Sequence, residues 1–196
     1  MTTITESWNA IDTWLRSHAP TTATMLVPPA EPELIAAAET TLGLTFHPEL
    51  VESLRQHNGV QDSANVLPMG VPLSLHEIIE HRQMLTETAI DVGGLVPRGD
   101  DTEPWWHELW LPFAHEDGDY QVIDLRPGPG YGRLGSKRNT EAGKFENSGD
   151  PHEPQYALVA WPTLSAYLAE VADVLHHGGR VAGWRPLTED SEMWWE

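Results

Sequence analysis

The sequence predicts an α+β protein, and the order of its elements is the main reason. Helical patterns come first, β-type runs gather in the middle of the chain, and one more helical pattern follows near the C-terminus. This order differs from the strand–helix alternation that is typical of parallel doubly wound folds. The 196 residues fit one domain with modest extensions, and a hydrophobic fraction of 40% with nine Trp is enough for a packed core.

Capping signals place the helices of the first half. Thr3 and Glu6 have the spacing of a capping box, which predicts a helix over about 5–17. Pro32 suits the first turn of a second helix, and Gly43 suits its end.

Two more helices are expected before residue 92. One begins at His47 and Pro48 and precedes a turn at 57–59. The next begins with a capping box of Ser74 and Glu77. Its inward residues are expected to be Ile78, Ile79 and Leu85, with Met84 as a further candidate.

Runs of β-type residues follow a long polar loop at 91–104. The expected strands are 109–114, 120–125, a shorter one around 133–134, and 156–160. Gly118 and Asp119 are expected to form the tight turn between the first two. Residues 66–69 are expected to be a short strand or extended segment, and a last helix is expected over 163–176.

We therefore expect a single domain over 1–179 and a Trp-rich C-terminal tail over 180–196. The segment 135–154 is polar, charged and Gly-rich, which predicts a mobile insert. The pattern does not decide whether the tail packs on the domain or stays free.

The chain has no Cys, which excludes disulfides, a catalytic thiol and thiolate metal sites. The N-terminal residues lack the features of a secretory signal, and no apolar run is long enough to span a bilayer. A cytoplasmic location is the resulting expectation.

The formal charge of −19 restricts the partners. Nucleic acids and anionic membranes would be repelled, whereas a basic protein would be attracted and its association accelerated. An acidic surface that only aids solubility is the alternative.

The sequence matches none of the catalytic or metal-binding motifs considered below. After His107 and Glu108, position 111 is Leu where a zinc-protease motif needs His. The turn at 115–119 lacks the ligand spacing of a calcium loop, and the Gly-rich segment 128–132 lacks phosphate-loop spacing. We expect no enzyme, no catalytic residue, no metal and no cofactor, although the many carboxylates leave a catalytic pair open.

One stretch, residues 98–119, combines carboxylates with Trp and predicts a partner-binding surface, because Trp anchors and charge orients. Trp110 lies in an apolar strand, and Trp106, an even number of residues earlier, would point to the same side of an extended segment. Both are therefore expected in the core, with Trp105 more exposed. The candidate binding residues are Asp100, Asp101, Glu103, Trp105, Glu108, Glu116, Asp117 and Asp119.

An ordered series of short motifs extends over about residues 4–178. The series comprises Trp8-x-x-Ile11-x-x-Trp14-Leu15, Leu26-Val27-Pro28-Pro29-Ala30, Ile35-x-x-x-Glu39-x-x-Leu42-Gly43, Pro48-Glu49-Leu50, Leu54-x-x-His57-Asn58-Gly59, Leu67-Pro68, Leu73-Ser74-x-x-Glu77-Ile78, Trp110-Leu111-Pro112-Phe113-Ala114, Gly118-Asp119 and Asp124-Leu125-x-Pro127-Gly128 with Gly132. This series resembles the SUKH superfamily, which includes fungal cell-wall-synthesis regulators and bacterial toxin-immunity proteins. The segment 135–154 and the tail depart from the pattern.

The resemblance implies a central, mostly antiparallel sheet packed with N-terminal helices and a C-terminal helix, and it implies no catalysis. It favours an immunity protein that binds and neutralises a toxin domain, possibly a nuclease, through an acidic surface. A regulatory scaffold in cell-wall or signalling assemblies is the alternative from a different class. The motifs are those of turns and core, so no binding residue is transferred, and the oligomeric state stays undetermined.

Overall fold

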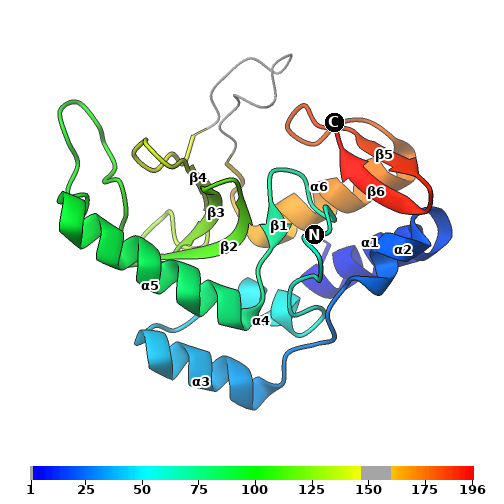
Figure 1. Cartoon of the computed structure of the whole chain (residues 1–196), viewed down its shortest axis with the longest axis horizontal. Coiled ribbons are helices and arrows are strands. Elements are labelled where there is room, and N and C mark those ends of the chain that lie inside the picture. The colour runs from blue at the N-terminus through cyan, green and yellow to red at the C-terminus, as the bar shows by residue number, and fades with distance from the viewer. Residues whose placement is uncertain (1, 147–159) are drawn as a thin grey trace.

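A computed structural model describes residues 2–146 and 160–196 (Figure 1). The α+β class is confirmed: the described residues form six helices, a four-stranded antiparallel sheet and a two-stranded hairpin. None of the described helices combines the length and the apolar character that a membrane span requires.

The first two helices lie together at the N-terminus. Helix α1 is Ile4–His18, and its capping box of Thr3 and Glu6 is formed as predicted. The short helix α2, Pro20–Thr24, was not expected from the sequence; Pro20 occupies its first turn, where a missing N–H costs no hydrogen bond.

The next three helices agree with their capping signals. Helix α3 is Pro32–Leu42 and ends at Gly43, whose φ of 63° is left-handed. Helix α4 is Pro48–Leu54. Helix α5 is Leu75–Val92 and has the predicted capping box at its start. One inward assignment on α5 is wrong: Met84 is 47% exposed.

The four strands of the main sheet follow one another in space as in sequence. They are β1 (Val71–Pro72), β2 (Trp110–Glu116), β3 (Asp119–Asp124) and β4 (Leu134–Lys137), and every pairing is antiparallel. A short strand or extended segment was predicted at 66–69; no strand forms there, since β1 begins at Val71 and Val66 and Leu67 are buried outside the sheet.

The turn between β2 and β3 lies one residue earlier than predicted. Glu116 pairs with Asp119, so Asp117 and Gly118 form the turn. Their φ values are 48° and 89°. A two-residue hairpin turn of this kind requires positive φ at both positions, and Asp-Gly satisfies that better than Gly-Asp.

Two apolar cores cover opposite faces of the sheet. On one face, Phe113 of β2 packs against Tyr167 of helix α6 (Leu164–His177), with the ring centroids 6.3 Å apart. On the other face, Trp110 and Tyr120 belong to a smaller core with Leu85 of α5. Trp106 joins the smaller core, so the prediction that Trp106 and Trp110 are buried is confirmed.

The C-terminal tail packs on the domain. Strands β5 (Pro186–Glu189) and β6 (Glu192–Trp195) form a hairpin, seen in red beside α2 in Figure 1. The side chains of Met193 and Trp195 belong to the main core. The Met193 amide donates a hydrogen bond to the Thr22 hydroxyl at 2.9 Å.

The segment 135–154 begins differently from the prediction. Residues 135–137 belong to strand β4 and are buried. The backbone of Lys144 forms an isolated antiparallel β-bridge with Ser136. The rest of that segment beyond 146, and the strand predicted at 156–160 except for Ala160, lie outside the described residues.

Candidate functional site

The candidate surface at 98–119 divides into exposed and inward-facing side chains. Most of its carboxylates are exposed, namely those of Asp100, Asp101, Glu108, Glu116, Asp117 and Asp119. Glu103 and Trp105 are partly buried instead, because both contact groups that come from later parts of the chain.

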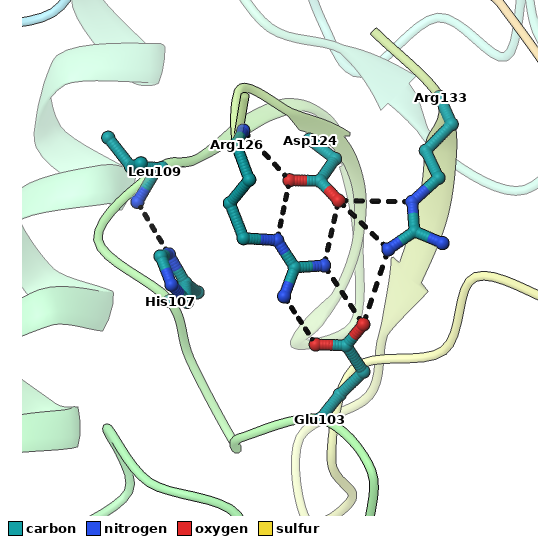
Figure 2. A network of polar contacts seen from close by, with 6 residues as sticks. All are labelled: Glu103, His107, Leu109, Asp124, Arg126 and Arg133. Atoms are coloured by element: carbon teal, nitrogen blue, oxygen red, sulfur yellow. Dashed lines mark hydrogen bonds and ion pairs between the residues drawn. The ribbon is translucent and has the colours of Figure 1, made fainter. Parts of the chain in front are cut away.

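Glu103 belongs to a network of two carboxylates and two guanidinium groups (Figure 2). Arg126 donates to Glu103 at 2.7 and 2.9 Å and to Asp124 at 2.8 and 2.7 Å. Arg133 donates to Asp124 at 3.0 Å and to Glu103 at 3.3 Å. The network joins the loop after α5 to the end of β3 and the start of β4.

Asp124 is the most buried member of this network. The side chain of Asp124 is only 2% exposed. Burial alone would raise the pKa of Asp124, but hydrogen bonds from Arg126 and Arg133 outweigh it and lower the pKa. Hydrogen bonds to Glu103 and Asp124 raise the pKa of Arg126. Asp124 and Arg126 therefore both stay ionised over the physiological pH range.

Aromatic rings close one side of the network. The Arg126 guanidinium lies 5.5 Å from the Trp110 ring centroid, and the Arg133 guanidinium lies 4.2 Å from that of Phe145. These are cation–π contacts, which strengthen when the groups are desolvated. The network thus holds the loop to the sheet, and Glu103 pairs with both arginines within it.

Trp105 is engaged within the chain as well. Its indole N–H donates to the Asn139 carbonyl at 2.8 Å. The Lys137 ammonium lies 3.9 Å from its ring centroid and donates to the Arg138 carbonyl. Burial lowers the pKa of Lys137 to about 8. The Asn139 amide also donates to Asp119 at 3.0 Å, so the structure links Trp105 and Asp119 through one residue.

The β2–β3 turn concentrates three carboxylates. Partial desolvation, followed by repulsion from Asp117 and Asp119, raises the pKa of Glu116. The Gly118 amide donates to the His115 ring at 3.0 Å, which stabilises the turn. Within the part of the chain that the structure describes, no group of three or more His, Cys, Asp or Glu is arranged to hold a metal ion.

The network around Asp124 was not predicted from the sequence. The sequence contains one local signal for it, an acidic residue two positions before Arg126. The partners Glu103 and Arg126 are 23 residues apart, and only the fold brings them together.

The architecture defines an α+β domain with helices on both faces of an antiparallel sheet, and its candidate site is an acidic surface. The chain belongs to the SMI1 / KNR4 family (SUKH-1), whose family model matches residues 29–170. The match covers well over half of the chain, from before α3 into α6. A comparison with curated proteins gives no match.

Proposed function

We propose that this chain is a non-catalytic immunity protein that binds a cognate toxin domain through its acidic surface and neutralises it. Membership of the SUKH-1 family supports a protein-binding role of the immunity or regulatory kind. The observation that carries the proposal is that the exposed carboxylates are poorly neutralised by the protein's own cations.

Six of the 11 Lys and Arg side chains are engaged inside the fold or with the backbone. Arg126 and Arg133 bind the buried carboxylates, and Lys137 is itself buried. The side chains that donate to backbone carbonyls are Arg82, Arg98 and Arg180. The 30 Asp and Glu side chains also outnumber all 11 Lys and Arg, so the surface keeps a large negative excess and its potential extends into solvent.

A toxin that acts on nucleic acid suits this potential. Such a toxin holds phosphates with Lys and Arg, and an acidic protein that covers the same face competes with the substrate. A complex of this kind buries about 1,600 Å² in total. Its association should slow as salt screens the charges.

The same family favours a second candidate, because its description names SMI1 and KNR4. That candidate is a regulatory scaffold in cell-wall or signalling assemblies. It predicts several weak partners and no neutralisation of a toxin.

Affinity capture from the native cells at low and at high salt, followed by an activity assay, tests the proposal. We expect a stoichiometric partner at low salt whose nuclease or other toxic activity is inhibited when the protein is added back. Partners without toxic activity would favour the scaffold, and an active partner that is not inhibited would exclude the immunity function.

A further inference from the structure

Five of the seven large apolar side chains that are exposed among the described residues lie in one stretch of the chain. This stretch is the C-terminal end of α5 and the loop that follows, at the left of Figure 1. Val96 is 64% exposed and Ile90 is 61% exposed. Four of the five, Ile90, Val92, Leu95 and Val96, lie within residues 87–101, and Met84 lies earlier on α5. We refer to residues 87–101 as the α5 tip.

The backbone of the α5 tip is held in place although its side chains are exposed. The Gly94 amide donates to the Ala89 carbonyl at 2.7 Å, and the Gly94 carbonyl accepts from the Trp106 amide at 3.1 Å. A Cβ on Gly94 would lie 3.0 Å from the Cβ of Trp105, so the loop packs closely against that residue. A surface ordered before binding loses less conformational entropy when a partner docks.

Four carboxylates lie in the same segment as the apolar side chains. They belong to Glu87, Asp91, Asp100 and Asp101, all of which are exposed. None of these four is in an ion pair with another of the described residues. The only cation of the α5 tip is Arg98, and its guanidinium donates to the Val92 carbonyl.

We infer that the α5 tip is the docking surface for a basic protein domain with an apolar centre. This inference rests on the proposed function and names the part of the surface that contacts the toxin domain. Apolar anchors within a charged rim are the usual anatomy of a protein interface. These four carboxylates form no ion pair with the described residues and so favour a partner of opposite charge, whereas a second copy of this chain or an anionic membrane would be repelled.

The α5 tip includes only part of the surface predicted from the sequence. Asp100 and Asp101 remain proposed contacts with the partner, whereas Glu103 and Trp105 hold the loop through hydrogen bonds within the chain. Ile90 and Val96 are added as anchors. These side chains were not identified from the sequence because they lie in a helix end and loop where apolar residues are usually assigned to the core.

A titration of the full-length, ¹⁵N-labelled protein with a defined probe tests the chemistry of the surface. The probe is a 14-residue helical peptide made of Lys and Leu with one apolar face. We expect amide shift changes centred on 87–101, and an affinity that falls as salt rises. I90S/V96S should weaken binding at least tenfold, and D91N/D100N/D101N should weaken it and reduce its salt dependence.

The matched control is E33Q/L34S at the start of α3, where Leu34 is 57% exposed next to an exposed carboxylate. It should bind the probe within twofold of the wild type. Urea unfolding of each variant verifies that the fold is retained. Shift changes centred elsewhere, or equal losses for the control and tip variants, would overturn the inference. So would a dimer, or binding to neutral lipid vesicles, that the tip variants abolish.

Capture of the native toxin partner with the same variants separates the two proposals. If the wild type captures and inhibits a toxin but the tip variants do so equally well, the docking surface is wrong and the immunity function stands. If the peptide binds at the α5 tip and captured partners have no toxic activity, the surface stands as a protein-docking site and the immunity function is wrong.

Discussion

Asp101 and Glu103 lie two residues apart in one loop, and their surroundings are opposite. Glu103 meets two guanidinium groups beside the nearly buried Asp124, whereas Asp101 is exposed and forms no ion pair with the described residues. The first environment fixes the loop to the sheet. The second leaves charge available to a partner. The comparison teaches that in an acidic chain the position of the few cations decides which carboxylates are structural.

The largest expected effect on stability is at Asp124, the most buried carboxylate of the network. Asp124→Ala leaves two guanidinium groups facing each other without their most buried partner. We expect the free energy of unfolding to fall by about 3–5 kcal/mol, as for other broken buried ion pairs. Urea denaturation measures the change. Asp100→Ala is the matched control and should change it by less than about 0.5 kcal/mol; similar losses in both would refute the distinction.

Lys137 extends the comparison to a buried cation, which forms no ion pair with any of the described residues. The pKa of Lys137 is lowered to about 8 from an ordinary value of 10.5, so between these values the unfolded chain binds more protons than the folded one. The stability of the wild type should therefore rise with pH over this window by up to about 3 kcal/mol relative to Lys137→Met. Unfolding curves at pH 7.5, 9 and 10 test this, and parallel pH profiles would contradict it.

The stability of the protein in acid tests the same network through the titration of Asp124. Because the pKa of Asp124 is lowered in the folded state, its stabilising contribution is complete above the unfolded value of 3.8 and is lost as pH falls through the folded value. The wild type should lose stability more steeply than Asp124→Asn below pH 4. Thermal unfolding between pH 2 and 6 measures both slopes, and equal slopes would show that Asp124 does not titrate in this way.

Trp105 is a predicted partner contact that is partly buried and also has contacts within the chain. Trp105→Leu removes the indole hydrogen bond to the Asn139 carbonyl and the contact with the Lys137 ammonium. We expect a loss of about 1–2 kcal/mol in unfolding free energy. Probe-peptide affinity is the second readout. A variant that keeps full stability and loses binding would make Trp105 a partner anchor, as the sequence predicts.

The smallest effect is expected at the β2–β3 turn. The pKa of Glu116 is raised, so the folded state is disfavoured as pH rises through the window above 4.5. Glu116→Gln should remove this effect and increase stability at pH 7 by less than about 0.5 kcal/mol, because the group is exposed. Differential scanning calorimetry at pH 4 and 7 tests the sign. A decrease at pH 7 would mean that Glu116 is favourably paired.

Local signals predicted most helices of this chain well. The capping boxes at Thr3 and Ser74 and the terminal Gly43 are formed where the sequence places them, because a cap depends on residues three or four positions apart. The α+β class followed from the order of such elements. The turn of the hairpin was misplaced by one residue, since the choice between two adjacent dipeptides depends on strand register.

The candidate site was predicted only in part, because long-range contacts decide burial. The sequence places eight candidate residues on one surface, but Glu103 and Trp105 turn inward toward Arg126 and Asn139, 23 and 34 residues later in the chain.

Composition and local pattern therefore determined the acidity, the capped helices and the class of fold. The tertiary structure alone decided which carboxylates meet an arginine, where the Trp-rich tail packs, and which apolar side chains remain exposed at the α5 tip. The reason is physical: capping is a contact between neighbours in sequence, whereas pairing and burial are contacts between segments that only folding brings together.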